Sequence, residues 1–116
     1  MRLTITGTGN ESREFVYLAD VVMETLLTLS TERSNGQIVH VGSGRSGTIR
    51  ELAEALIAMT RSRSAIQYLP RRPWDTITSR VTICSKAQEL LGDARIVDFD
   101  TRLTCAIDWI RASLGR

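Results

Sequence analysis

The sequence contains few of the features on which membrane, disulfide and metal sites depend. Its 116 residues include one histidine, two cysteines and 5% aromatic side chains. No apolar run approaches the roughly 20 residues that a membrane-spanning helix needs, and the start, Met1-Arg2-Leu3-Thr4, lacks the apolar stretch of a signal peptide. Cys84 and Cys105 form no CxxC motif. We therefore expect a cytoplasmic chain without membrane association, with both cysteines reduced and packed.

The common catalytic motifs are also missing. The sequence has no HExxH, no Walker lysine and no serine elbow. Tyr17 and Tyr68 are followed four positions later by Val21 and Arg72, so there is no Tyr-x-x-x-Lys pair. His40 falls inside an expected strand, where a structural role is favoured over a role as base or ligand. We expect this chain to carry no catalytic residue and no metal site.

An excess of charge of one sign is likewise absent. Fifteen basic side chains face 13 acidic ones, for a net charge of +2. Proteins that bind nucleic acid usually carry a much larger basic excess, so we expect no nucleic-acid partner. All basic residues except Lys86 are arginines. Arginine suits the two-point recognition of phosphate or carboxylate, although the base composition of the genome can produce the same bias.

Short β-like runs alternate with amphipathic segments along the chain. A chain of this length can bury about two-thirds of the surface of its unfolded state, so we expect it to form its own core. Thr48 and Glu51 have the spacing of a helix capping box. The pattern predicts one α/β domain over residues 1–116, with short, largely parallel strands and packed helices. The expected strands cover residues 3–6, 13–18, 37–41 and 65–69, and the expected helices residues 20–31, 48–59, 85–91 and 101–114.

The loop over residues 42–47, Gly42-Ser43-Gly44-Arg45-Ser46-Gly47, matches the GxGxxG fingerprint of dinucleotide-binding domains. It follows an expected strand and precedes a helix, as that fingerprint requires. The acidic residue expected about 20 positions later is missing, because the first acid beyond the next strand is Asp75. Gly7-Thr8-Gly9 fails as a fingerprint, since Ser12 takes the third glycine position and an extended run follows. A small dinucleotide-binding domain using Gly42 to Gly47 stays open as an alternative.

Five segments, taken together and in order, resemble the C-terminal portion of the NAD-dependent nucleotide-sugar epimerase/dehydratase family. These extended short-chain dehydrogenases/reductases include UDP-glucose 4-epimerase. The similarity covers nearly the whole chain. The segments are Thr6-Gly7-Thr8-Gly9 with Arg13-Glu14-Phe15-Val16-Tyr17, Val39-His40-Val41-Gly42-Ser43-Gly44 with Thr48-Ile49-Arg50-Glu51-Leu52, Pro70-Arg71-Arg72-Pro73-Trp74-Asp75, Ser85-Lys86-Ala87, and Ala106-Ile107-Asp108-Trp109.

The resemblance implies a substrate-binding role. In this family the cofactor fingerprint and the catalytic Tyr-x-x-x-Lys pair lie in an N-terminal Rossmann domain, which is absent from this chain. By position, Arg13 and Arg72 match two arginines that bind the diphosphate of a UDP- or dTDP-type sugar. Asp75 matches an acid near the ribose, and Ile49 an apolar contact beside the base. No cofactor is expected in this chain, whereas the complete enzyme would use NAD or NADP.

Several positions depart from the family pattern. Glu14 replaces an aspartate, His40 an asparagine, Ile83 an aspartate and Arg102 a glycine. We expect Asp20 to cap the helix that it begins. The resemblance further implies that the chain is inactive alone, and that its exposed apolar surface meets the missing Rossmann domain or drives self-association. The alternative, from another class of function, is a non-catalytic binding or assembly module.

Overall fold

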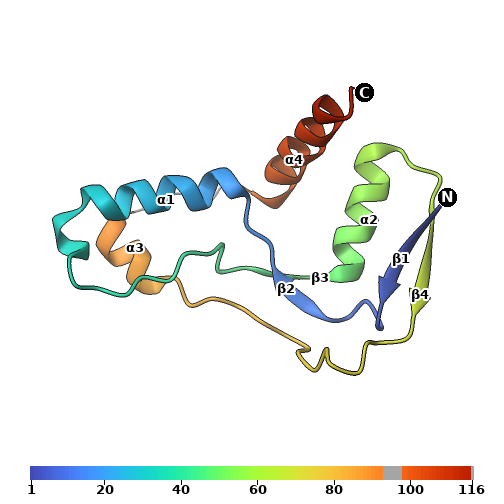
Figure 1. The fold of residues 1–116 in the computed structure, drawn as a ribbon, viewed down its shortest axis with the longest axis horizontal. Helices are drawn as coiled ribbons and strands as arrows, with labels where there is room; N and C mark the ends of the chain where they lie inside the picture. Colours follow the sequence, from blue (N-terminus) through green and yellow to red (C-terminus); the bar gives the residue numbers. More distant parts are fainter. Residues whose placement is uncertain (93–97, 116) are drawn as a thin grey trace.

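Four α-helices and four short strands make up the computed structural model, which describes residues 1–92 and 98–115. The predicted positions of the four helices and of the first, second and last strands are confirmed to within a few residues, whereas the third strand lies at 46–48, within the expected loop (Figure 1). The elements are β1 (Arg2–Thr6), β2 (Ser12–Glu14), α1 (Leu18–Ser30), the single 3-10 turn η1 (Glu32–Ser34), β3 (Ser46–Thr48), α2 (Ile49–Thr60), β4 (Ala65–Leu69), α3 (Ser85–Leu91) and α4 (Phe99–Ser113).

The strands form two separate pairs. β1 and β4 are parallel, with Arg2 opposite Ala65, whereas β2 and β3 are antiparallel, with Arg13 opposite Gly47. The α/β class is confirmed, but the expectation of largely parallel strands is correct for only one of the two pairs. The β2–β3 pair places the candidate residue Arg13 beside the start of α2.

Local sequence signals set the ends of several helices. The predicted capping box is confirmed: the Glu51 N–H donates to Thr48 Oγ1 at 3.1 Å, and the Thr48 N–H donates to Glu51 Oε2 at 2.8 Å. α3 ends at Gly92, which has φ of 76° and continues the chain out of the helix. α1 begins earlier than expected, at Leu18, with Tyr17 as its N-cap residue.

Asp20 does not cap α1, contrary to expectation. It lies inside the first turn of the helix and is buried, and its Oδ1 accepts a hydrogen bond from Nη2 of Arg102 on α4. The Arg102 guanidinium also lies 5.4 Å from the centre of the Tyr17 ring, a cation–π contact. A long-range ion pair therefore takes the place of the local cap.

The strand expected over residues 37–41 is wrong. In the described part of the chain these residues belong to no strand, and Gln37 is the one member with a backbone hydrogen bond, to the Ser34 carbonyl. The Ile38 side chain is 79% exposed and His40 is exposed as well. His40 is therefore not the packed strand residue that the sequence predicted. A strand requires a neighbour for its N–H and C=O groups, and this segment has none among the described residues.

The chain buries few of its own apolar side chains. The buried ones among the described residues are Ile5, Ala53, Ala87 and Ile107. The radius of gyration is 16.8 Å, against about 13 Å for a compact domain of this length. One end carries α1, η1 and α3, the other carries β1, β4 and α2, and the β2–β3 pair and α4 lie between them (Figure 1). The expectation that the chain forms a full core of its own is therefore wrong.

None of the helices in the described ranges combines the length and the apolar character that crossing a bilayer requires.

Candidate functional site

The candidate site is a cluster of basic side chains around Arg13 of β2. The Arg13 Nη1 donates to the Ser12 carbonyl at 2.8 Å, and Nη2 donates to the Ile77 carbonyl at 2.9 Å. Nη2 also lies 3.5 Å from Oδ1 of Asp75. The structure thus brings together two of the residues nominated from the sequence, Arg13 and Asp75, although 62 positions separate them.

Hydrogen bonds to β2 hold the segment that carries Asp75. The Ser12 N–H donates to the Thr78 carbonyl at 2.8 Å, and the Ser12 and Ser79 hydroxyls lie 2.8 Å apart. A turn precedes this contact, closed by the Asp75 N–H donating to the Arg72 carbonyl at 3.1 Å. The two prolines of the loop keep it out of helical structure. The segment from Asp75 to Ser79 is consequently held along β2.

Arg71 is a member of the cluster that the sequence analysis missed. Its Nη2 lies 3.7 Å from Asp75 Oδ1. Its Nε and Nη2 are buried and have no hydrogen-bond partner among the described residues. The nominated residue Arg72 is exposed, and within residues 1–92 and 98–115 its guanidinium makes no hydrogen bond or ion pair. The tandem Arg71-Arg72 was the signal available, but the resemblance selected only the second arginine.

The fourth nominated residue, Ile49, begins α2 and is half-buried. Its N–H donates to the Glu11 carbonyl at 3.0 Å. In the β2–β3 ladder Arg13 lies opposite Gly47, and Ser12 lies opposite Thr48. Ile49 directly follows Thr48 and is two positions from Gly47. Ile49 thus lies at the end of the strand pair that carries Arg13.

The first glycine turn is occupied by a carboxylate of the chain itself. The N–H groups of Thr8 and Gly9 donate to the two oxygens of Glu11 at 3.0 and 2.9 Å. These backbone hydrogen bonds, led by the one from Thr8, lower the pKa of Glu11 from its ordinary 4.5 to about 2. A phosphate cannot use these donors, because Glu11 already does.

The second glycine loop, over residues 42–47, is likewise filled from within. Glu14 of β2 accepts hydrogen bonds from the Gly44 N–H through Oε1 and from the Thr82 N–H through Oε2. A Cβ at position 42 would overlap the Glu14 carboxylate, which accounts for Gly42. The strand that a dinucleotide fingerprint needs before the loop is also missing from the described chain. The structure therefore disfavours the dinucleotide-binding alternative.

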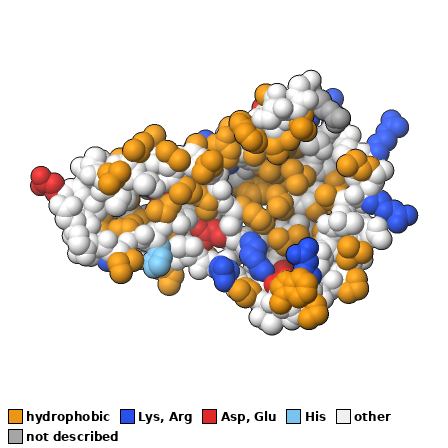
Figure 2. Space-filling model, in the orientation of Figure 1, with side chains coloured by type: hydrophobic (Ala, Val, Ile, Leu, Met, Phe, Trp, Pro, Cys, Tyr) orange, Lys and Arg blue, Asp and Glu red, His pale blue; other side chains and the backbone are white. Residues whose placement is uncertain are grey.

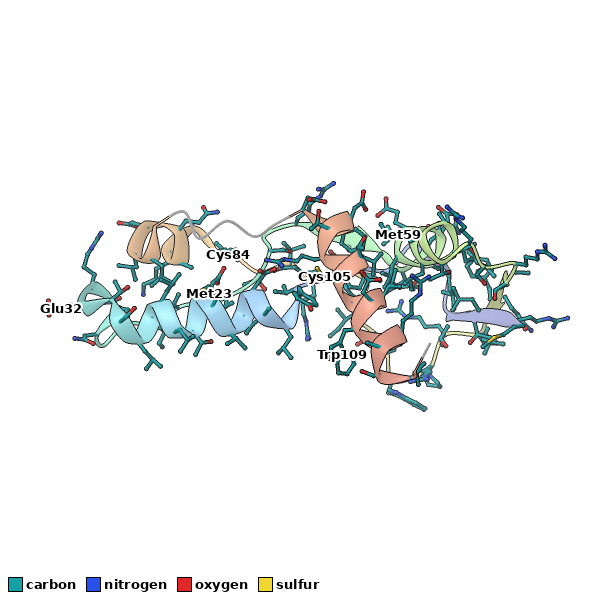
Figure 3. The ribbon with its side chains drawn as sticks, turned by 90° about the horizontal axis from the view of Figure 1, so that it is seen from above. Met23, Glu32, Met59, Cys84, Cys105 and Trp109 are labelled. Atoms are coloured by element: carbon teal, nitrogen blue, oxygen red, sulfur yellow. The ribbon has the colours of Figure 1, made fainter. Side chains whose placement is uncertain are left out.

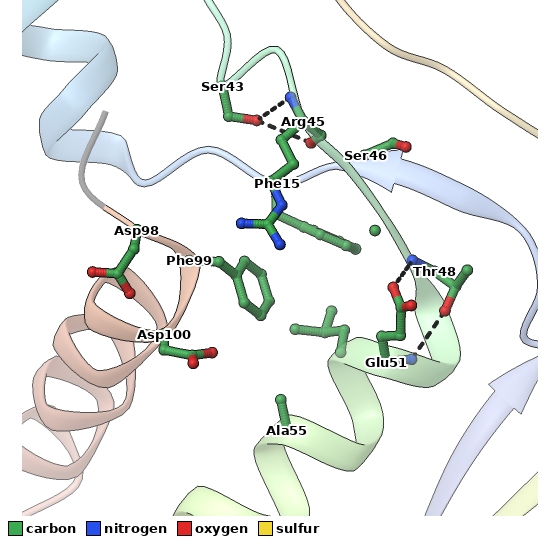
Figure 4. Close-up of a pocket in the computed structure, with 12 residues that line it drawn as sticks. Phe15, Ser43, Arg45, Ser46, Thr48, Glu51, Ala55, Asp98, Phe99 and Asp100 are labelled. Atoms are coloured by element: carbon green, nitrogen blue, oxygen red, sulfur yellow. Dashed lines mark hydrogen bonds between the residues drawn. The ribbon is translucent and has the colours of Figure 1, made fainter. Parts of the chain in front are cut away.

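A hollow of about 530 Å³ lies beside the β2–β3 pair (Figure 4). The rings of Phe15 and Phe99 lie 6.0 Å apart along its wall. Arg45 lines it together with three carboxylates, those of Glu51, Asp98 and Asp100. This acidic lining repels an anionic diphosphate, whereas the cluster around Arg13 attracts one. The arginine cluster is therefore the better candidate site for a diphosphate.

The environment of Cys84 disfavours the thiolate that nucleophilic chemistry needs. Cys84 and Cys105 are unpaired, as predicted, but each is only half-buried. Burial raises the pKa of Cys84, and the nearby carboxylates of Glu14 and Glu24 raise it further. In the described ranges, no group of three or more His, Cys, Asp or Glu side chains is placed to hold a metal ion.

Comparison with known proteins identifies a family of relatives. No family model matches the chain. UDP-glucuronic acid decarboxylase 1 of Danio rerio is 31% identical over 112 residues, which are 97% of this chain and 26% of that protein. UDP-N-acetyl-alpha-D-glucosaminuronate decarboxylase of Bacillus cytotoxicus is 28% identical over 114 residues, 94% of this chain and 35% of that protein.

Solved structures agree with these sequence relatives. UDP-glucose 4-epimerase of Thermotoga maritima, solved with UDP-glucose, superposes with a TM-score of 0.88 at 27% identity, over 97% of this chain and 36% of that one. MoeE5 in complex with UDP-glucuronic acid and NAD superposes with a TM-score of 0.85 at 26% identity, over 97% and 37%. The predicted resemblance is confirmed, and this chain spans about a third of the length of its relatives.

Proposed function

We propose that this chain, which is homologous over nearly its whole length to NAD-dependent nucleotide-sugar epimerases and dehydratases, binds the nucleotide sugar in such an enzyme. The observation that carries the proposal is the convergence of Arg13, Arg71 and Asp75 on the edge of β2. The relatives named above take UDP-sugars, which makes a nucleoside diphosphate sugar the ligand class to test.

Charge and donor geometry support a diphosphate ligand. Arg13 and Arg71 share the carboxylate of Asp75, so the two guanidinium groups carry one positive charge more than the acid that pairs with them. A guanidinium has five N–H donors. Arg13 donates two of these N–H groups to the Ser12 and Ile77 carbonyls. These hydrogen bonds orient the guanidinium and leave its other donors for an anion.

Each residue has a distinct proposed role. Arg13 and Arg72 bind the diphosphate, with Arg13 held in place beforehand and Arg72 free to close on the ligand. Asp75 accepts a hydrogen bond from a ribose hydroxyl, and Arg71 orients its carboxylate. Ile49 packs against the base. None of these residues transfers a proton or hydride, so we propose that the chain is inactive alone and that NAD or NADP serves in the complete enzyme.

Calorimetric titration with UDP, UDP-glucose, dTDP, GDP and NAD tests the proposal. We expect affinity for UDP or dTDP that falls by about 10- to 100-fold in Arg13→Ala, since a hydrogen bond to a charged group contributes about 1.5–3 kcal/mol. Arg63→Ala is the matched control, because Arg63 is an exposed arginine between α2 and β4. Binding of NAD but of no other titrant, or an affinity for UDP that Arg13→Ala leaves unchanged, would overturn the assignment of this cluster as a diphosphate site.

The large exposed apolar area favours a second candidate, a non-catalytic assembly module. Leu18, Leu29 and Ile38 are each more than 70% exposed. This function predicts that Arg13→Ala and Arg72→Ala leave partner binding unchanged. Sedimentation of both variants with and without UDP-glucose separates the two candidates.

A further inference from the structure

Trp74 is a large aromatic side chain that lies exposed at the candidate site. It is 76% exposed and follows Arg72 and precedes Asp75, two residues proposed to bind the nucleotide sugar, with only Pro73 between it and Arg72. Within residues 1–92 and 98–115 its ring takes part in no aromatic pair and no cation–π contact. The described part of the chain therefore leaves the indole ring available to a ligand.

A tight turn sets the place of Trp74 in the loop. The Asp75 N–H donates to the Arg72 carbonyl at 3.1 Å, so residues 72–75 form a β-turn with Pro73 and Trp74 at its two central positions. Proline suits the first of these positions because its ring fixes φ at about −65°. Arg61 is the only non-glycine residue with a positive φ in the described ranges, so Trp74 adopts an ordinary backbone conformation. The turn thus presents the indole without backbone strain.

The same turn is tied to the arginine cluster. Consecutive Cα atoms are about 3.8 Å apart, so Trp74 adjoins Asp75, whose Oδ1 lies 3.5 Å from Nη2 of Arg13. After the turn, the Ser12 N–H donates to the Thr78 carbonyl at 2.8 Å and holds the segment on β2. Figure 2 shows basic and hydrophobic side chains next to one another over the segment that joins β4 to α3, at the lower edge of the view. The indole and the arginine cluster thus lie at the same place on the surface.

Guanidinium groups beside an exposed aromatic ring are suited to the two ends of a nucleotide. Arginine binds phosphate through charge-assisted hydrogen bonds. An aromatic side chain binds the face of a nucleobase by stacking, whichever base it is, because every base has a π face. In a nucleoside diphosphate the ribose lies between the phosphates and the base. The order of groups in the ligand therefore matches the order Arg13, Asp75 and Trp74 in the site.

We infer that Trp74 stacks on the nucleobase of the nucleotide sugar and makes the site select a nucleoside diphosphate over a free diphosphate. This inference rests on the proposed function, because it assigns the base of the nucleotide whose diphosphate binds the arginine cluster. Trp74 is a contact to the base in addition to the one proposed for Ile49. Stacking does not read the hydrogen-bonding edge of the base, so Trp74 adds affinity for a nucleotide without selecting uracil.

Calorimetric titration with two ligands tests the inference. UDP carries a base, and inorganic pyrophosphate carries the diphosphate alone. We expect Trp74→Leu to weaken the binding of UDP by about 5- to 100-fold and to leave the affinity for pyrophosphate unchanged. Trp74→Phe keeps an aromatic ring and should restore part of the UDP affinity. Arg13→Ala should weaken the binding of both ligands, since both carry the diphosphate.

Tryptophan fluorescence gives a second, direct measurement. The chain has two tryptophans. The other one, Trp109, lies on α4 (Figure 3), on the opposite side of the molecule from the segment that joins β4 to α3 (Figure 1). In Trp109→Phe, where Trp74 is the sole tryptophan, UDP should quench the emission with the dissociation constant that calorimetry gives, and pyrophosphate should not. Trp74→Phe leaves Trp109 as the sole tryptophan and is the matched control, in which UDP should not change the emission.

Two results would overturn the inference. One is binding of UDP that leaves the emission of Trp74 unchanged. The other is a Trp74→Leu variant that weakens UDP and pyrophosphate by the same factor, as a purely structural role would, or that weakens neither.

The inference and the proposed function fail in different ways. If Arg13→Ala weakens both ligands and Trp74→Leu weakens neither, the diphosphate site stands and the stacking is refuted. If Trp74→Leu weakens UDP and Arg13→Ala has no effect, the stacking stands and the diphosphate site is refuted. If the chain binds neither UDP nor pyrophosphate, both are overturned.

Discussion

Glu14 and Thr82 are joined by a hydrogen bond of 2.6 Å, from the Thr82 N–H to the Oε2 atom of Glu14. The other oxygen, Oε1, accepts from the Gly44 N–H at 3.2 Å. One carboxylate on β2 therefore holds both the glycine loop and the segment that leads into α3. The family resemblance predicted an aspartate here, and the longer glutamate extends the carboxylate to reach both segments.

Glu14→Gln should destabilise the fold. A neutral amide can accept from only one of the two N–H groups and turns its own NH2 toward the other. Leaving a half-buried donor unsatisfied costs about 1–3 kcal/mol. We expect the free energy of unfolding in urea to fall by that amount. Glu54→Gln on the exposed side of α2 is the matched control, and an equal effect in both variants would contradict the role given to Glu14.

Glu11 should make stability depend on pH in the acid range. Hydrogen bonds from the turn lower its pKa from 4.5 to about 2 in the folded state. The folded state thus binds this proton less readily than the unfolded state does, so the contribution is complete above pH 4.5 and is lost as pH falls toward 2. We expect wild type and Glu11→Gln to differ most near pH 6 and to converge near pH 2 in urea unfolding. If the difference in free energy of unfolding between wild type and Glu11→Gln did not change with pH, the charge of the Glu11 carboxylate would not contribute to stability.

Glu24 should make the fold more stable at acid pH than at neutral pH, the opposite of the effect of Glu11. Burial raises its pKa, and the neighbouring Asp20 raises it further. The folded state binds the proton more tightly, so the charged form costs stability at neutral pH and the cost disappears on acidification. Glu24→Gln should therefore increase the melting temperature at pH 7 and leave it unchanged below pH 4.5. Glu89→Gln on α3, an exposed site, should change neither value.

Local signals predicted much of the fold correctly. Runs of β-forming residues located β1 and β4, the Thr48–Glu51 spacing located the start of α2, and Gly92 located the end of α3. Each of these depends on a few adjacent residues. The prediction of a strand over residues 37–41 is wrong, because strand pairing needs a neighbouring strand, which the local sequence does not specify.

The candidate site was only partly predictable for a related reason. Arg13 and Asp75 were nominated by resemblance, and the structure places them 3.5 Å apart. Arg71 was missed, because which of two adjacent arginines turns toward Asp75 depends on how the 70–84 segment lies along β2. The roles of the Glu11 and Glu14 carboxylates in the glycine loops were missed too. Both loops resemble sequence patterns that bind a ligand, and such patterns do not show that an acidic side chain of the same chain accepts the hydrogen bonds instead.

The ion pair between Asp20 and Arg102 gives the last prediction. It joins α1 to α4, and its side chains are only 9% and 26% exposed. Arg102→Met keeps the apolar length of the side chain but leaves the buried Asp20 carboxylate without a counter-ion, which costs about 3–5 kcal/mol. Arg111→Met removes an arginine from the exposed pair with Asp108, where the cost is below about 1 kcal/mol. In urea unfolding, we expect Arg102→Met to lower the free energy of unfolding by more than Arg111→Met does. Adding Asp20→Asn to Arg102→Met should restore part of the lost free energy of unfolding. Equal destabilisation by Arg102→Met and Arg111→Met, or no restoration by Asp20→Asn, would mean that the pair does not hold α4 to α1.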